Sequence, residues 1–256
     1  GMTRSAAGRE VVPAVQKLRL RYAKRGRLRF ASHRDFQRAF ERALRRAEVP
    51  MAYSAGFSPH PKVSYANAAP TGTASEAEYV EIGVLERLDP DAVRAALDEA
   101  LPPGLDVVEV VEARTPDLVA RLEASWWRIE LPGVDPGAAG AAVEALLAQD
   151  EAPVQRRTKN GMRTLDARAA ILVLEVEPAR AGEGSGHPCA ILTLVVRHGT
   201  PSVRPDDVLA ALRRAADLAP VEPPRVTRLA QGPLDQDGRS VGDPFAPDRG
   251  EDVVGA

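Results

Sequence analysis

The sequence contains one cysteine, few aromatic residues and no long apolar run. A single cysteine, Cys189, excludes an internal disulfide and any zinc or iron–sulfur site built from cysteines. Cys189 stands in an apolar stretch, which predicts a buried thiol that behaves as a small hydrophobic residue. No segment approaches the roughly 18 apolar residues that cross a bilayer, and residues 1–10 lack an apolar signal region. We therefore expect a soluble cytoplasmic protein without a membrane segment.

Motifs for cofactors are also missing. The sequence has no glycine-rich nucleotide-binding motif, no nucleophile elbow and no spacing of histidines and carboxylates that is typical of a metal site. We expect no cofactor and no metal ion.

Charge is distributed very unevenly, although the net charge of the whole chain is only −2. The segment 17–46 has twelve basic and two acidic residues, a net charge of +10. The segment 75–124 has four basic and thirteen acidic residues, a net charge of −9. The basic segment predicts a surface for an anionic ligand, while the rest of the chain repels such a ligand.

The pattern of residues 14–115 predicts the order strand, helix, strand, strand, helix, strand. Charged and apolar residues alternate over 17–22; a turn follows at Lys24–Gly26, and the alternation resumes at Leu28 and Phe30. Ser32 and Asp35 predict a capping box that begins a helix. The other elements expected here are a helix over 33–48, strands over 63–66, 78–85 and 105–111, and a helix from Pro90 to Leu101.

The same order recurs over residues 124–232, with a hairpin predicted at Asn160–Gly161. We therefore predict an α+β protein of two tandem ferredoxin-like (βαββαβ) domains, 14–115 and 124–232. Each domain would have an antiparallel sheet with helices on one face and the other face free. Residues 233–256 are rich in Gly, Asp and Pro without any period, which predicts a disordered tail.

Several motifs in the first half point to one family. They are Phe30–Asp35, Ala43–Arg46, Tyr53–Lys62, Gly72, Ser75–Glu76 and Glu78–Tyr79. Over residues 19–82 the chain resembles the radical-SAM-linked domain family, which occurs as a tail on cobalamin-binding radical SAM proteins and as a separate protein in many bacteria. The resemblance implies a radical SAM protein as partner, with RNA as the substrate, and it assigns no activity to this domain. With one cysteine, the chain cannot hold the iron–sulfur centre itself.

The basic segment supplies the candidate nucleic-acid-binding residues. Arginines on the first strand and a row on the first helix could follow a phosphate backbone, and the loop after the helix adds a histidine and a lysine. The predicted RNA-binding residues are Arg19, Arg21, Arg38, Arg42, Arg45, His60 and Lys62.

Two histidines are candidates for acid–base catalysis. His33 begins the predicted helix, where it could act as a general base with Asp35 or serve as a hydrogen-bonded residue of the helix cap. His60 lies between Pro59 and Pro61, which restrict its backbone, so it could stack on a base or transfer a proton.

Three functions follow from these patterns. The first is an RNA-associated accessory protein that works with a radical SAM enzyme in RNA modification or processing. The second is a metal-independent endoribonuclease that uses His33 or His60. The third is a protein-interaction module whose arginines meet an acidic partner.

Overall fold

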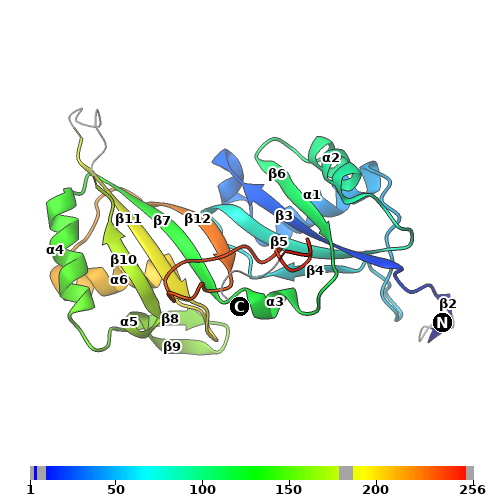
Figure 1. Ribbon diagram of the computed structural model, residues 1–256. Coiled ribbons are helices and arrows are strands. Elements are labelled where there is room, and N and C mark those ends of the chain that lie inside the picture. Colours follow the sequence, from blue (N-terminus) through cyan, green and yellow to red (C-terminus); the bar gives the residue numbers. More distant parts are fainter. Residues whose placement is uncertain (1–2, 5–9, 179–186, 252–256) are drawn as a thin grey trace. The chain divides into compact units, whose positions relative to one another are not determined.

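The computed structural model describes residues 3–4, 10–178 and 187–251 and combines helices with antiparallel strands (Figure 1). The predicted α+β class is therefore confirmed. The chain divides into two compact units. The first unit contains the residues up to Val119 and those from Phe245 onward, and the second spans Ala120–Pro244. The chain thus returns to the first unit after it has completed the second.

The first unit has the element order βαββαβ. Antiparallel pairings order its sheet as β4–β5–β3–β6, so the first and third strands of the unit lie in the middle. Its main elements are β3 (Gln16–Lys24), α1 (His33–Arg46), β4 (Val63–Ala66), β5 (Ala74–Val84), α2 (Pro90–Ala100) and β6 (Leu105–Glu112). Shorter elements are β1 (Thr3–Arg4), β2 (Glu10–Val11), the 3-10 helix η1 (Gly26–Phe30) and, at the boundary between the units, α3 (Leu118–Arg121).

One core holds both helices of the first unit against the same face of the sheet. Strands β3 and β5 turn every second residue toward it, among them Leu18, Leu20 and Ile82, which are fully buried. From α1 it receives Phe36 and Phe40, whose rings lie 5.6 Å apart. Burial of such side chains contributes roughly 1.5–3 kcal/mol each, which is the main force that fixes the helices on the sheet.

The second unit repeats this order with an inserted hairpin. Its sheet runs β10–β11–β7–β12, with every neighbour antiparallel. Its elements are β7 (Ala124–Pro132), α4 (Pro136–Leu147), β8 (Pro153–Thr158), β9 (Gly161–Asp166), α5 (Ala167–Ala170), β10 (Ile171–Val176), β11 (Cys189–Arg197), α6 (Pro205–Ala216) and β12 (Arg225–Gly232). The hairpin β8–β9 that the sequence predicts turns at Lys159–Asn160, and Gly161, the first residue of β9, has φ of 101°.

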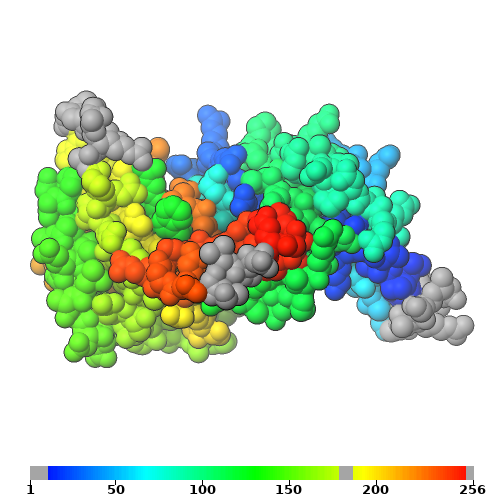
Figure 2. Space-filling model, in the orientation of Figure 1, coloured from blue at the N-terminus to red at the C-terminus, as the bar shows by residue number. Residues whose placement is uncertain are grey.

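The structure corrects the prediction of a disordered tail over 233–256 in the part that it describes. Leu234 pairs with Val241, and the side chains of Phe245 and Asp248 are buried. In the space-filling view other atoms of this C-terminal segment, coloured orange to red, are visible at the surface (Figure 2). The composition suggested disorder because few apolar residues occur in this segment, but one buried ring and one buried carboxylate are sufficient to hold it. Residues 252–256 lie outside the described part.

The same segment also corrects the prediction that the second face of the first sheet is free. The ring of Phe245 packs edge-on against Tyr79 of β5, with ring centroids 5.2 Å apart. Tyr79 is only 2% exposed as a result. Chain from the C-terminal end of the protein therefore covers part of this face.

Two local predictions also differ from the structure. Leu28 and Phe30 belong to the 3-10 helix η1 and not to a strand. Apolar residues two positions apart are typical of a strand, but they also occur in a short 3-10 turn. Here Leu28 is half-buried and Phe30 is exposed. Cys189 is exposed at the first position of β11, although the strand that follows it is buried.

Candidate nucleic-acid interface

Helix α1 is strongly amphipathic. The Ser32 hydroxyl accepts a hydrogen bond from the Asp35 amide at 3.0 Å, and the Asp35 carboxylate accepts one from the Ser32 amide at 3.3 Å, which completes the predicted capping box. Beyond this cap, Phe36, Phe40 and Leu44 enter the core. The opposite face carries five exposed arginines: Arg34, Arg38, Arg42, Arg45 and Arg46.

These five arginines lack carboxylate partners, unlike Lys17, Arg19 and Arg25 of the same segment. Among the described residues, no Asp or Glu oxygen lies within 4.0 Å of any of the five guanidinium groups. By contrast, Arg25 contacts Glu76 at 2.5 Å and Asp106 at 2.9 Å. We call the five residues Arg34, Arg38, Arg42, Arg45 and Arg46 the α1 arginine face.

The acidic segment accounts for this difference. Strands β5 and β6, which belong to that segment, flank β3, so their carboxylates meet the basic side chains of the strand. Glu81 of β5, for example, contacts both Lys17 and Arg19. Helix α1 points its arginines away from the sheet, where these carboxylates do not reach.

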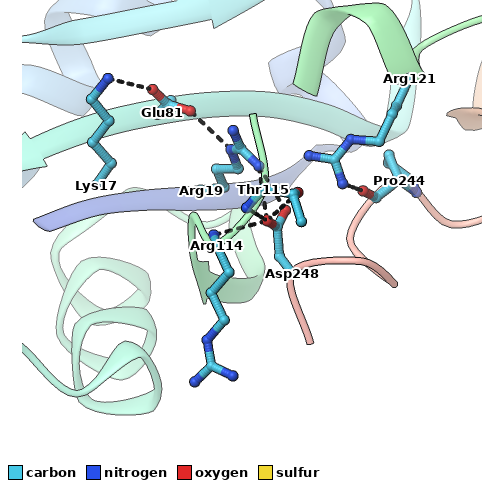
Figure 3. A network of polar contacts seen from close by, with 8 residues as sticks. All are labelled: Lys17, Arg19, Glu81, Arg114, Thr115, Arg121, Pro244 and Asp248. Atoms are coloured by element: carbon cyan, nitrogen blue, oxygen red, sulfur yellow. Dashed lines mark hydrogen bonds and ion pairs between the residues drawn. The ribbon is translucent and has the colours of Figure 1, made fainter. Parts of the chain in front are cut away.

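Arg19 is therefore not available to a ligand, contrary to the prediction. Its side chain is only 4% exposed and donates to Glu81 at 2.9 Å and to both oxygens of Asp248 at 2.8 and 2.9 Å (Figure 3). Asp248 Oδ1 also accepts the backbone amides of Arg114 and Thr115 and the Thr115 hydroxyl. Burial alone would raise the pKa of Asp248, but these donors more than offset burial and lower it.

Arg21, the second strand arginine in the prediction, is half-buried. Its Nε is enclosed and has no hydrogen-bond partner among the described residues. An anionic ligand of the basic segment would therefore contact the arginines of α1 and not those of β3.

His60 and Lys62 lie on the exposed hairpin that follows α1. The His60 Nδ1 is 3.1 Å from the Ser54 hydroxyl and 3.3 Å from the Ser58 carbonyl. Both contacts use Nδ1, so the Nε2 edge of the ring is left toward solvent on an exposed residue. Lys62 is exposed at the end of the same hairpin.

Of the two roles that the sequence left open for His33, the structure shows a hydrogen-bonded residue at the start of α1, while Asp35 contacts Ser32 instead. Its Nε2 is 3.0 Å from Gln37 Nε2, and its ring packs edge-on against Tyr65 with centroids 4.9 Å apart. Burial lowers the pKa of His33; the buried Glu78 carboxylate opposes that shift, and Lys24 adds to it. His33 is therefore a neutral imidazole at pH 7.

The sequence did not predict that polar residues are buried beneath the start of α1. Glu78 is 3% exposed and accepts the Ala69 amide at 2.8 Å and the Ser75 hydroxyl at 2.7 Å. Lys24 is 5% exposed, and the Tyr65 hydroxyl is enclosed without a hydrogen-bond partner among the described residues. The signal available in the sequence was the position of Glu78 in β5, on the same side as Val80 and Ile82.

No metal-binding cluster was found in the part of the chain that the structure describes, where no three His, Cys, Asp or Glu side chains lie close enough to hold an ion. No helix among these residues has the length and apolar character that crossing a membrane requires.

The structure is thus that of an α+β protein with two units, the first of which carries a basic helix. By comparison of its sequence with protein families, the chain belongs to the family described as "Uncharacterized protein conserved in bacteria (DUF2344)", whose model matches residues 17–205. No curated protein matches the chain. Among solved structures, the chain shows a weak likeness to the encapsulated DyP-type peroxidase from Mycobacterium smegmatis. Sequence identity is 11%, 86% of this chain and 92% of that chain are covered, and the TM-score is 0.19.

Proposed function

We propose that this protein binds RNA through the α1 arginine face and acts as an accessory module that holds RNA for a partner enzyme. The observation that carries the proposal is five exposed arginines on one helix with no carboxylate within 4.0 Å among the described residues. An unpaired row of cations on a rigid helix is costly for folding because like charges repel, and a polyanion removes this repulsion.

The spacing of the row supports a phosphate backbone as ligand. Arg38, Arg42 and Arg45 follow each other by four and three residues, so their Cβ atoms are roughly 5–6 Å apart. Such a row can contact several phosphates of one strand in succession. A basic helix that binds phosphates without reading bases positions RNA and leaves the chemistry to another protein.

The partner in this proposal is a radical SAM enzyme that modifies or processes RNA. It rests on the family resemblance of residues 19–82, since those enzymes carry a similar domain as a tail. The single cysteine of this chain is compatible with the division of roles, because the partner would supply the iron–sulfur centre.

The test is RNA binding by the wild type and by Arg38→Glu/Arg42→Glu/Arg45→Glu from about 50 to 300 mM salt. We expect the triple variant to lose binding and wild-type affinity to fall steeply with salt, with a slope of about −0.7 per phosphate contact on a single strand. Circular dichroism checks that the helix is retained, since Phe36, Phe40 and Leu44 are unchanged.

The matched control is Arg38→Lys/Arg42→Lys/Arg45→Lys, which keeps the charge at the same three positions. Its binding should stay close to wild type, because counterion release depends on the number of charges that meet phosphates. An acidic protein partner would use fewer, more desolvated charges and depend less on salt. Absence of RNA binding at low salt, or equal binding by the wild type and the Glu variant, would leave the protein-interaction module as the better function.

A further inference from the structure

Hydrogen bonds join the two arms of the hairpin that follows α1. At its base, the Lys62 amide donates to the Ala52 carbonyl at 2.8 Å, and the Ala52 amide donates to Gly83 of β5 at 2.9 Å. Tyr53 pairs with Pro61, and the Ser54 amide donates to the His60 carbonyl at 2.9 Å. The hairpin is therefore an ordered extension of the sheet edge.

Two aromatic rings are exposed on this ordered hairpin. Tyr53 is 49% exposed and Phe57, near the tip, is 77% exposed. Gly56, just before Phe57, has φ of 129°, which residues with a side chain rarely adopt, so the tip bends sharply and turns the ring outward. A ring held outward on an ordered backbone loses little conformational freedom when it meets a ligand.

The charged residues of the hairpin favour an anionic ligand. No Asp or Glu occurs between Glu48 and Glu76, whereas His60 and Lys62 are both exposed in this interval. The chain passes from the last arginines of α1 to the hairpin in only a few residues. Aromatic rings near a lysine and an imidazole, in a segment without carboxylates, suit single-stranded nucleic acid.

We propose that Tyr53 and Phe57 stack on unpaired bases of the RNA whose phosphates contact the α1 arginine face. This inference rests on the proposed function and narrows it, because the RNA recognised is single-stranded or a loop. In a duplex the bases are stacked on one another and their faces are closed to a protein ring. The hairpin thus adds a requirement for unpaired bases to a surface that otherwise senses charge alone.

The experiment compares wild type with Tyr53→Ala/Phe57→Ala on a labelled single-stranded RNA and on a duplex of the same sequence. Binding is measured by fluorescence anisotropy at about 50 mM salt, where phosphate contacts are strong. We expect the wild type to prefer the single strand. The double variant should bind the single strand at least about tenfold more weakly, since each stacked base contributes about fivefold or more and two rings are removed. Duplex binding should be unchanged.

Two further variants make the result specific to stacking. Tyr53→Phe/Phe57→Tyr keeps both rings and should restore single-strand binding. Met162→Ala, which removes an exposed apolar side chain from the other hairpin, should have no effect.

Failure of this inference is distinguishable from failure of the proposed function. Preference of the wild type for duplex, or unchanged single-strand binding in Tyr53→Ala/Phe57→Ala, overturns the inference and leaves the arginine result standing. If only the arginine variant loses RNA binding, the stacking inference is likewise overturned and the proposed function stands. If the rings instead mediate binding to vesicles of anionic lipid, with single-strand binding unaffected, the hairpin is a membrane contact and the inference is also overturned.

Discussion

Replacing Asp248 by Ala tests the contact that returns the end of the chain to the first unit. Arg19 is 4% exposed, and the side chain of Asp248 is fully buried in contact with it at 2.8 Å. Removal of the carboxylate leaves a buried guanidinium with Glu81 as its remaining partner in Figure 3. Breaking a buried pair in this way costs about 3–5 kcal/mol. For a unit of this size, this corresponds to a fall in Tm on the order of 10–20 °C.

The assay is urea unfolding followed by far-UV circular dichroism, with thermal melting as a second measure. Arg19→Met should cost less than Asp248→Ala. After Arg19→Met, Asp248 still accepts the amides of Arg114 and Thr115 and the Thr115 hydroxyl. Arg239→Ala is the control, because its pair with Glu175 is exposed on both sides and is worth less than about 1 kcal/mol. If Asp248→Ala is within about 1 kcal/mol of wild type, the argument that this contact holds the segment is refuted.

Two further predictions follow from the histidines. Burial lowers the pKa of His198; the hydrogen bond to the Leu122 carbonyl opposes this shift, and Arg228 adds to it. The neutral form of His198 is therefore favoured by folding. Its contribution to the free energy of unfolding is fully present above the unfolded pKa of about 6.5 and is lost as the pH falls through the folded pKa. His198→Gln should flatten this fall, measured by urea unfolding from about pH 7.5 to 5, and an unchanged slope would show that His198 does not cause it. Purified protein with chelator should not cleave structured RNA. Gln37 and Tyr65 contact the His33 ring, and no carboxylate or second histidine contacts His60 among the described residues. Chelator-resistant cleavage that His33→Ala or His60→Ala slows at least about a hundredfold would instead favour the endoribonuclease.

Most secondary structure could be predicted because each element carries its own local signal. Short-range chemistry marks the boundaries at the Ser32–Asp35 cap, at the prolines that begin α2, α4 and α6, and at the turn that precedes Gly161. These signals depend on a few neighbouring residues, so they are visible in a single sequence. The element order of both units follows from them.

Contacts between distant parts of the chain could not be predicted in the same way. Asp248 lies 229 residues from Arg19, and nothing in its neighbourhood of Gly, Asp and Pro marks it as a partner. The placement of His33 against Tyr65 depends on how α1 lies over the sheet, whereas the candidate pairing with Asp35, one of two roles considered, used sequence proximity alone. In the structure Asp35 belongs to the helix cap.

The basic segment illustrates why a local count of charge overestimates a binding surface. Its net charge of +10 includes strand residues, such as Lys17 and Arg19, whose neutralising carboxylate Glu81 lies more than 60 residues further along. Antiparallel pairing brings β5 beside β3 and converts part of the excess into ion pairs within the protein. An amphipathic helix has no such neighbour on its outer side, so its charges remain for a ligand. The proposed binding surface is therefore limited to exposed arginines of α1 that have no carboxylate partner among the described residues. Charge reversal at Arg38, Arg42 and Arg45 tests whether this face binds a ligand or is only solvated.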